Sequence, residues 1–266
     1  MENIIAVAKK LIPNYLKKIA SAGLYFIGLK KPDQASTLRI GTFSGFEVAY
    51  RKNTADEQVI AHSFKNDIFF AAVPDYKPVD GHVIIDIGAH IGTFSLLAAS
   101  KVKSGKVFAV EPCEDTFNLL RINAALNKAD NISAQRTALS DKKGTCTLYY
   151  DKGNWGHSIV RPLSRHGETV EICTLAYFME KNEISACDFM KVNCEGAEFP
   201  IILSTPIEML KKFGVILVLY HSFLWKKNAE ADLLFHLKSC GFRTALSNVC
   251  DERGWLIAIN ENRTGK

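Results

Sequence analysis

The chain has 266 residues, of which 47% are hydrophobic and 23% are charged, with 17 glycines, 8 prolines and 7 cysteines. This composition excludes a disordered chain, and no stretch of 18 apolar residues without a charge is present that would cross a membrane as one helix. The net charge of +5 equals that of residues 1–31 alone, so the rest of the chain lacks the broad basic surface that nucleic-acid binding needs.

Residues 3–29 combine apolar residues with lysine pairs and predict one or two short amphipathic helices with a break near Pro13. Two interpretations stay open for this segment. It is either an arm or lid that packs over the main domain, or an attachment to an anionic membrane surface through residues 1–31.

The seven cysteines are an odd number and contain no C-x-x-C pair, which predicts reduced and buried thiols rather than a disulfide framework or a zinc site. The N-terminus lacks the single clean apolar core of a signal peptide. We therefore expect a cytoplasmic protein, with peripheral membrane contact as a separate hypothesis.

Residues 38–51 alternate in a way that predicts a hairpin turning near Ser44 and Gly45. Thr54 and Glu57 have the spacing of a capping box and predict the start of a helix of about ten residues. We expect an N-terminal arm and hairpin over residues 1–53 and a main domain over residues 54–266.

From Gly81 onward, short apolar strands alternate with amphipathic helices. This alternation predicts an α/β fold with a parallel, doubly wound (Rossmann-like) sheet. The last two predicted strands, near residues 242–249 and 255–260, are separated by a short polar turn and should pair antiparallel. The predicted strands before them are HVIIDIG, KVFAVEP, ISAQRTALS, CDFMKVN and VILVLYH, and the predicted helices are IGTFSLLAAS, EDTFNLLRINAALN, EGAEFPIIL and AEADLLFHLKSC.

The segment from Asp86 to Thr93 follows the first of these strands and opens a helix. Gly88 and Gly92 let the backbone turn tightly and approach a ligand, and the helix N-terminus suits a carboxylate or phosphate. The spacing G-x-x-x-G differs from the G-x-G-x-x-G of dinucleotide-binding proteins. Glu111 ends the next strand, where a carboxylate accepts hydrogen bonds from a ribose diol.

Residues 151–167 form a polar connection that is longer than such folds normally need, and long loops in compact domains are often functional. Within it, Trp155, His157 and Arg161 are candidates to bind a glycosyl or anionic substrate. A solvated loop would use the same residue types, so both interpretations stay open.

The stretches VIIDIGAHIGTFSLLAA, VFAVEPCEDTFNLLRINAALN, NISAQRTALSD and DFMKVNCEGAE, in this order, resemble the FkbM family of S-adenosylmethionine-dependent methyltransferases. The resemblance covers residues 55–245 or so. It implies the class I methyltransferase fold, a seven-stranded, mostly parallel sheet with an antiparallel last strand. It also implies an enzyme with S-adenosylmethionine as cofactor, and its known members mostly methylate hydroxyl groups.

The same resemblance implies a set of cofactor-binding residues. The first strand and its glycine loop would hold the methionine part, Glu111 the ribose, and the ALSD tetrapeptide the adenine. Asn193, on the later strand DFMKVN, belongs to the same set, and Asn123 matches a family asparagine that we expect to be structural. The implied cofactor-binding residues are Asp86, Gly88, Ala89, His90, Gly92, Thr93, Glu111, Leu139, Ser140, Asp141 and Asn193.

Four residues are candidates at the reaction edge of the sheet. Lys191, Asn193 and Glu195 alternate, so they should share one side of the strand until the next helix begins. Lys191 is a candidate to orient a substrate oxygen. Glu195 is either catalytic or stands at the start of that helix because the helix dipole favours a carboxylate there. His221 ends the strand VILVLYH and is a candidate general base, because its ordinary pKa lies near neutrality; a structural role stays open.

The sequence departs from the family pattern at the reaction edge. Asn193 stands where the family usually has an acid, Leu219 and Tyr220 replace an acid that often precedes the histidine, and Ala176 replaces the Asp of a T-L-D motif. His90 stands where Asn is common. Because an amide binds Mg²⁺ poorly compared with a carboxylate, we expect no required metal.

The leading hypothesis is an O-methyltransferase that acts on a hydroxyl of a sugar, glycolipid or other secondary-metabolite acceptor. The alternative is a catalytically impaired binding protein with the methyltransferase fold, and the missing acids motivate it. A nicotinamide-dependent oxidoreductase has the wrong glycine spacing and would need a catalytic dyad that we do not find. The expected partner is a small-molecule or glycan acceptor, not nucleic acid, and the oligomeric state stays open.

Overall fold

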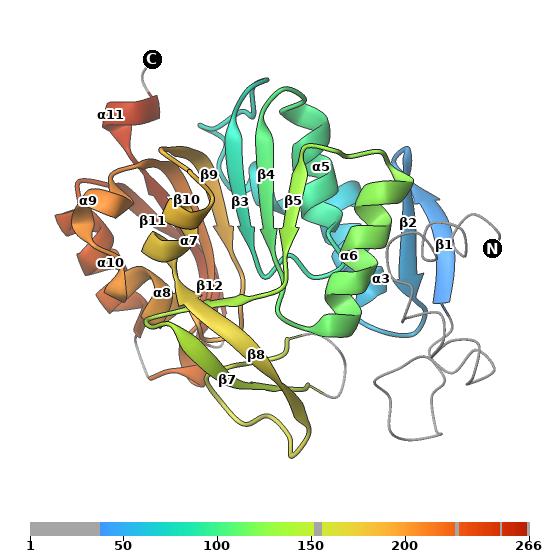
Figure 1. The fold of residues 1–266 in the computed structure, drawn as a ribbon. Helices are drawn as coiled ribbons and strands as arrows, with labels where there is room; N and C mark the ends of the chain where they lie inside the picture. Colours follow the sequence, from blue (N-terminus) through green and yellow to red (C-terminus); the bar gives the residue numbers. More distant parts are fainter. Residues whose placement is uncertain (1–37, 152–155, 227–228, 251, 265–266) are drawn as a thin grey trace.

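The computed structural model describes residues 38–151, 156–226, 229–250 and 252–264. Its centre is a seven-stranded sheet in the order β11-β12-β10-β9-β3-β4-β5 (Figure 1). The helices expected over residues 3–29 lie outside the described residues. The strands of this sheet are β3 (Val83–Ile87), β4 (Lys106–Val110), β5 (Ile132–Gln135), β9 (Cys187–Val192), β10 (Phe213–His221), β11 (Arg243–Cys250) and β12 (Arg253–Ile259).

The direction of the strands confirms the expected topology. β3, β4, β5, β9 and β10 are parallel, whereas β12 runs antiparallel to both β10 and β11. The chain enters the sheet at β3, proceeds outward to β5, and returns to the other side of β3 at β9. This reversal of order opens a crevice at the carboxyl ends of β3 and β9, where such folds bind their ligands.

Both faces of the sheet are buried, which explains why its central strands are continuously apolar. Along β3, Ile85 and Ile87 contribute to one core and Ile84 to the other, as the two-residue period of a strand requires. The first core includes residues of α7, α8 and α10, and the second includes residues of α4 and α5. The bounds are α4 (Ile68–Ala71), α5 (Thr93–Lys101), α7 (Leu175–Lys181), α8 (Glu198–Ser204) and α10 (Ala229–Ser239).

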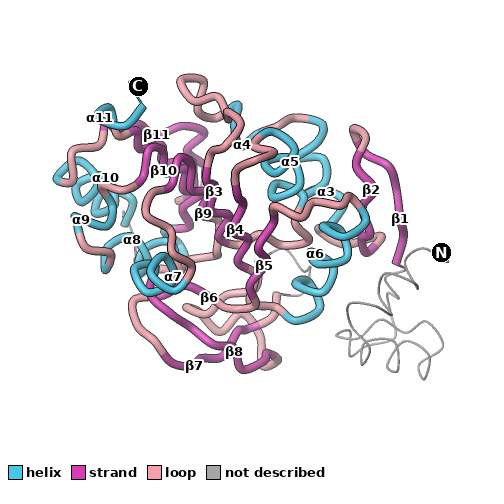
Figure 2. Tube along the Cα trace, turned by 45° about the horizontal axis from the view of Figure 1, so that its top comes forward, coloured by secondary structure: helices cyan, strands magenta, loops and turns pink. Residues whose placement is uncertain are grey.

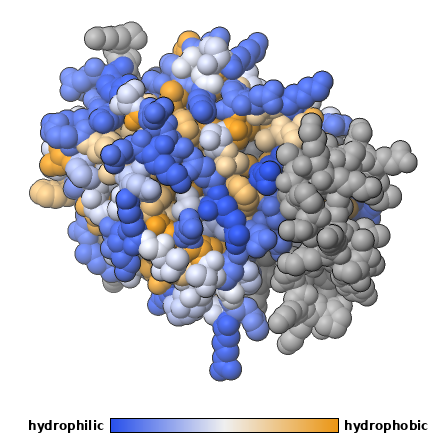
Figure 3. Space-filling view, viewed as in Figure 1, coloured by the Kyte–Doolittle hydropathy of each residue, from blue (hydrophilic) through white to orange (hydrophobic). Residues whose placement is uncertain are grey.

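The remaining helical segments are short, apart from α6. They are α3 (Asp56–Ile60), the π-helical turn η1 (Ala61–Lys65), α6 (Glu114–Leu126), α9 (Ile207–Leu210), the 3₁₀ turn η2 (Ser222–Leu224) and α11 (Glu261–Thr264). Among the described residues, no helix combines the length and the apolar character needed to cross a membrane. The face seen in Figure 3 is largely hydrophilic, with small scattered apolar areas.

The expected hairpin is confirmed as β1 (Leu38–Phe43) and β2 (Phe46–Arg51), which pair around Ser44 and Gly45. It lies against α6, on the outer side of the domain (Figure 2). Asn123 of α6 joins the two elements, since its side chain accepts a hydrogen bond from Ala49 N (2.7 Å) and donates to Ala49 O and Ile91 O. This buried amide has the structural role that we expected.

The predicted capping box is displaced. The helix begins at Asp56, and its N-cap is Ala55 without a side-chain hydrogen bond. The Thr54 hydroxyl accepts from the Asp56 amide, and the Glu57 carboxylate accepts from the amide of Asn53. The same side chains therefore stabilise the turn before the helix, and α3 continues into η1, which together approach the predicted length.

A second sheet, not foreseen in the sequence, lies beyond the carboxyl ends of the central strands (Figures 1 and 2). It has the order β6-β8-β7. The predicted single strand ISAQRTALS is wrong, because the chain leaves the edge of the main sheet after Gln135 and pairs Ala138–Ser140 with β8 instead. The strands are β6 (Ala138–Ser140), β7 (Gly144–Tyr149) and β8 (Gly167–Thr174).

Two further expectations are corrected. The helix predicted from EGAEFPIIL begins at Glu198, so Glu195 lies in the preceding turn with φ 51° and not in the first helical turn. Among the cysteines, Cys250 is exposed and Cys146, Cys173 and Cys194 are only half-buried. The expectation of uniformly buried thiols is therefore wrong at the edge strand β11.

Candidate active site

A cavity of about 580 Å³ lies over the carboxyl ends of the central strands. The sheet order determines the order of the residues around it: Glu111 follows β4, Gly88 follows β3, Asn193 follows β9, His221 ends β10 and Arg253 begins β12. This volume is in the range that a small-molecule or cofactor site needs. The cavity therefore has one end at the glycine loop and another at the antiparallel strand.

The glycine loop has the strained backbone that its sequence indicates. Gly88 and Gly92 have φ angles of 75° and 83°, and His90 between them has φ 53°. A Cβ atom on Gly88 would lie 1.8 Å from the Asn193 carbonyl oxygen. Only glycine fits this position, because the loop touches the backbone that follows β9.

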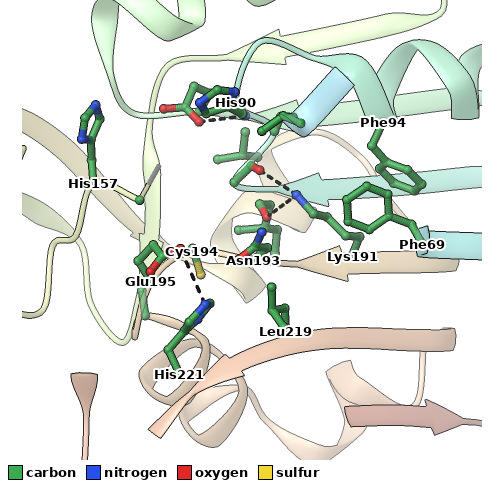
Figure 4. A pocket seen from close by; sticks show the side chains of 18 of the residues that line it. Phe69, His90, Phe94, His157, Lys191, Asn193, Cys194, Glu195, Leu219 and His221 are labelled. Atoms are coloured by element: carbon green, nitrogen blue, oxygen red, sulfur yellow. Dashed lines mark hydrogen bonds and ion pairs between the residues drawn. The ribbon is translucent and has the colours of Figure 1, made fainter. Parts of the chain in front are cut away.

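A buried ion pair supports the loop from below. Lys191 Nζ lies 2.9 Å from Asp86 Oδ1 and donates to the Gly88 carbonyl oxygen at 2.6 Å. Asp86 Oδ2 accepts from the hydroxyl of Ser95 at 2.6 Å. The ammonium group reaches the cavity wall beside Phe69 and Phe94 (Figure 4), whereas Asp86 lies beneath the loop and does not line the cavity. Lys191 therefore holds the loop in place, and its charge is already paired.

Glu111 lines the cavity next to the loop, with 7% of its surface exposed. Its carboxylate accepts hydrogen bonds from the backbone amides of His90 (3.0 Å) and Cys113 (2.9 Å). Burial raises the pKa of Glu111 to about 7, although these amide donors act in the opposite direction. Each carboxylate oxygen retains acceptor capacity for a donor in the cavity.

Asn193 lies on the floor between the two ends of the cavity (Figure 4). Its Oδ1 atom is buried and accepts no hydrogen bond from any described residue. A buried amide oxygen without a donor costs free energy, so this oxygen is suited to accept a hydrogen bond from a ligand in the cavity. The cradle at Gly88 and this acceptor together fit the amino-acid part of a cofactor such as S-adenosylmethionine.

At the other end, His221 is buried between two carboxylates. Glu198 Oε1 accepts from His221 Nδ1 at 2.8 Å. On the other side of the ring, Glu195 Oε1 lies 3.6 Å from Nε2, and Figure 4 shows these two side chains next to each other. Burial lowers the pKa of His221, but the hydrogen bond and the charge of Glu198, together with Glu195, outweigh it and raise the pKa overall. The arrangement fixes the ring so that Nε2 faces the cavity.

Glu195 and Glu198 have different surroundings. Glu198 is fully buried, and its carboxylate also accepts from the backbone amides of Cys194 and Gly196. Glu195 lines the cavity, and burial raises its pKa. Glu198 was not among the residues predicted from the sequence; the signal that would have found it is the EGAE tetrapeptide, whose second acid begins the helix.

The long connection brings some of its predicted residues to the site. Trp155 lies outside the described residues. His157 lines the cavity; its Nδ1 accepts from the Asp151 amide at 3.1 Å, and burial lowers its pKa to about 4, so the ring is neutral. Arg161 does not reach the cavity, because its guanidinium donates to the carbonyl oxygen of Phe223.

The expected adenine end is only partly formed as predicted. Ala138 and Leu139 line the cavity, as do Ala89 and Thr93 near the loop. Ser140 and Asp141 do not line the cavity. The Ser140 hydroxyl donates a hydrogen bond to Asp141 Oδ1, and Asp141 is exposed. Gly92 is also absent from the lining, since it packs on α6.

Several lining residues were not foreseen, because they come from segments far from the recognised motifs. They are contributed by α3 and the segment after it, and by the antiparallel strand β12. Among them are Gln58, His62, Phe69, Arg253 and Trp255. Among the described residues, no group of three His, Cys, Asp or Glu side chains is placed to hold a metal ion.

The sheet order, the antiparallel last strand and the glycine loop with its acidic partner define the class I methyltransferase fold. Comparison with known proteins agrees with this class. The family model described as the methyltransferase FkbM domain matches residues 86–244, more than half of the chain. The chain belongs to the FkbM methyltransferase family. A second model, described as the Vibrio cholerae RfbT protein, matches residues 8–148.

One curated relative is the methyltransferase sdnD of Sordaria araneosa, 38% identical over 80 residues, which are 30% of this chain and 31% of that protein. The match thus spans about a third of the relative's length. Similar solved structures include fibrillarin of Aeropyrum pernix with bound S-adenosyl-L-methionine (TM-score 0.46, 13% identity, 86% of this chain and 85% of that chain). Another is precorrin-6y C5,15-methyltransferase of Geobacter metallireducens (TM-score 0.45, 14% identity, 73% and 87%).

Proposed function

We propose that this protein is an S-adenosylmethionine-dependent O-methyltransferase that acts on a hydroxyl of a sugar, glycolipid or other secondary-metabolite acceptor. The observation that carries the proposal is one cavity with two different ends. A glycine loop and Glu111 lie at one end, and His221, oriented by Glu198, lies at the other. Membership of a methyltransferase family supports the methyl-transfer part of this proposal.

The residues around the glycine loop would hold the cofactor. The loop at Gly88–His90 and the Asn193 amide suit the amino-acid part, and Glu111 suits the ribose diol. Ala138 and Leu139 supply an apolar wall for the adenine. When bound, the cofactor supplies a methyl group on a sulfonium, which is activated for displacement.

His221 would act on the acceptor as a general base. A neutral hydroxyl is a poor nucleophile, so its proton must leave as the oxygen attacks. With Nδ1–H donating to Glu198, Nε2 carries the lone pair; this atom lies 3.6 Å from Glu195 Oε1 at the cavity and would take that proton. The buried Glu198 then stabilises the imidazolium that forms, so the base and its counter-charge are both in position before reaction.

Calorimetry tests the cofactor site directly. We expect S-adenosylmethionine and S-adenosylhomocysteine to bind the wild type, and Glu111→Ala to lose about 1.5–3 kcal/mol of binding free energy, or roughly 10- to 150-fold in Kd. Glu208→Ala is the matched control, since this carboxylate is exposed on α9, does not line the cavity and forms an ion pair with Lys211. Equal binding by wild type and Glu111→Ala would exclude the ribose role.

Single-turnover transfer of a labelled methyl group tests the chemistry. Replacing His221 with Ala should slow transfer by about 10²- to 10⁴-fold while leaving S-adenosylhomocysteine binding intact. If the cofactor binds but no hydroxyl acceptor is labelled by the wild type, the protein is instead a binding protein that retains the methyltransferase fold.

A further inference from the structure

The end of the cavity over β10 and β12 has a mixed lining that the cofactor-binding residues do not explain. Phe69, Phe94, Leu219 and Trp255 form an apolar wall there, and Arg253 adds a single cation at its edge. Arg253 and Trp255 at this end come from a part of the chain that neither family model covers.

Arg253 is the direct neighbour of the candidate base. In the antiparallel pairing of β10 with β12, His221 lies opposite Arg253, and Leu219 lies opposite Trp255. Side chains at opposed positions of antiparallel strands point to the same face, with Cβ atoms about 5 Å apart. His221 is buried and Arg253 is exposed, so the guanidinium group lies at the cavity rim beside the imidazole.

The charge of Arg253 is available to a ligand. Within the described part of the chain, the lysine and arginine side chains that line the cavity are Lys191 and Arg253. Lys191 is paired with Asp86 at 2.9 Å, whereas no carboxylate of the described residues lies within 4.0 Å of the Arg253 guanidinium. The nearby Glu195 is closer to His221, at 3.6 Å. A guanidinium presents a fork of N–H donors that matches a carboxylate or a phosphate.

We propose that the methyl acceptor is an anion, and that Arg253 binds its carboxylate or phosphate group while His221 faces its hydroxyl. The proposal rests on the function proposed above and narrows its acceptor class. Because the two side chains are cross-strand neighbours, the anionic group and the reactive hydroxyl belong to the same small part of the acceptor. A hydroxy acid, a sugar acid or a sugar phosphate has this pattern.

The binding test uses inorganic phosphate and acetate as probes on the full chain loaded with S-adenosylhomocysteine. The indole N–H signal of Trp255, assigned with Trp255→Phe, reports on the site by NMR at an ionic strength held constant with chloride. We expect saturable shifts of this signal, weakened at least about tenfold in Arg253→Gln and partly retained in Arg253→Lys. The probe that saturates at the lower concentration identifies a carboxylate or a phosphate as the preferred group.

Arg243→Gln is the matched control, because Arg243 lies at the other end of the same strand pair and bonds to Asp75 and Glu261. It should bind phosphate as the wild type does. The proposal would be overturned if Arg253→Gln bound the probes as tightly as the wild type does. It would also be overturned if neither probe caused a saturable shift of the Trp255 signal in the wild type. Failure of S-adenosylhomocysteine to bind would instead count against the proposed function. The two outcomes can be distinguished, because the anion titration can be repeated on the protein without S-adenosylhomocysteine.

A transfer test addresses the acceptor itself. A small-molecule extract is incubated with the enzyme and methyl-labelled S-adenosylmethionine, and the products are separated on an anion-exchange column. Label in the retained, anionic fraction, reduced at least about tenfold with Arg253→Gln but not with Arg243→Gln, supports the proposal. Label confined to the neutral fraction contradicts it. The absence of label in every fraction contradicts the methyltransferase function on which the proposal rests.

Discussion

The side chain of His221 contacts two carboxylates that differ in their exposure to the cavity. Glu198 is fully buried and bonds to Nδ1, whereas Glu195 lines the cavity near Nε2. A buried acceptor on one ring nitrogen determines which tautomer is present and leaves the other nitrogen for the substrate. In the proposed reaction, Glu198 is therefore a positioning residue that would act through His221.

The pH dependence of turnover tests this role. His221 must be neutral to accept a proton, and its pKa is raised by Glu198 and Glu195, so kcat should fall as the pH drops below a value higher than 6.5. Glu198→Gln removes a negative charge beside the ring and should move this acidic limb to lower pH, with a lower plateau. A purely structural Glu198 would lower kcat without moving the limb.

Glu111 predicts a second pH effect, on cofactor binding rather than on turnover. Burial raises its pKa to about 7, and only the ionised form accepts two hydrogen bonds from a diol. Affinity for S-adenosylhomocysteine should therefore weaken as the pH falls through about 7, and binding near that pH should release a proton from Glu111. Calorimetry in buffers of different ionisation enthalpy measures this release, which Glu111→Gln should abolish.

At the scale of elements, the glycine loop depends on its contact with the chain after β9. The Lys191–Asp86 pair and the close approach of Gly88 to Asn193 join β3 to β9 beneath the cavity. Two strands that are adjacent in the sheet but distant in the sequence thus bring Gly88 and Asn193 together at the cavity. Removing one partner of such a buried ion pair costs about 3–5 kcal/mol, because the other charge stays buried.

Alanine substitution at Gly88 measures the value of this contact. Its Cβ would lie 1.8 Å from a carbonyl oxygen, so the loop must move, and we expect a loss of cofactor binding and a clear fall in the free energy of unfolding. Gly45→Ala is the control: it also has positive φ, 88°, but has no atom within 4 Å of the added methyl. That variant should lose only about 1 kcal/mol. If Gly88→Ala and Gly45→Ala lost the same free energy of unfolding in urea, the close contact of Gly88 with Asn193 after β9 would contribute nothing to stability.

For the molecule as a whole, the net positive charge is concentrated at one end of the sequence. Residues 1–31 carry the whole net charge of +5, and the rest of the chain is neutral overall. The cavity itself lies within the described residues, where α3, β9, β10 and β12 all contribute lining residues. We propose that residues 1–31 bring the protein to an anionic membrane surface, as their lysines and apolar residues suggest.

Co-sedimentation with vesicles tests this proposal. The full chain should pellet with vesicles rich in anionic lipid, and less so as salt is raised, whereas a 32–266 truncation should remain in the supernatant. S-adenosylhomocysteine binding by the truncation checks that it is folded. Equal pelleting of the two proteins would contradict membrane attachment through this segment.

Local signals in the sequence predicted most of the central sheet. These signals are the apolar strands, the glycines of the loop and the polar turn before the last strand. Each of them spans only a few residues, so it can be recognised without knowledge of the fold. They predicted the parallel sheet, the antiparallel last strand and the loop at Gly88. They did not predict the β6-β8-β7 sheet, because β6 belongs to it only through its pairing with a segment more than 30 residues away.

The amino-acid sequence was sufficient to predict the central sheet, the family and the candidate residues Glu111, Asn193 and His221, because each of these residues lies at the end of a recognisable apolar strand. The side chains that surround these residues became apparent only in the folded protein. Glu198 forms a hydrogen bond with His221, which is 23 residues away in the sequence, and Arg253 is the cross-strand neighbour of His221. The physical reason is that such contacts depend on the register of packed elements, which no local pattern of residues encodes.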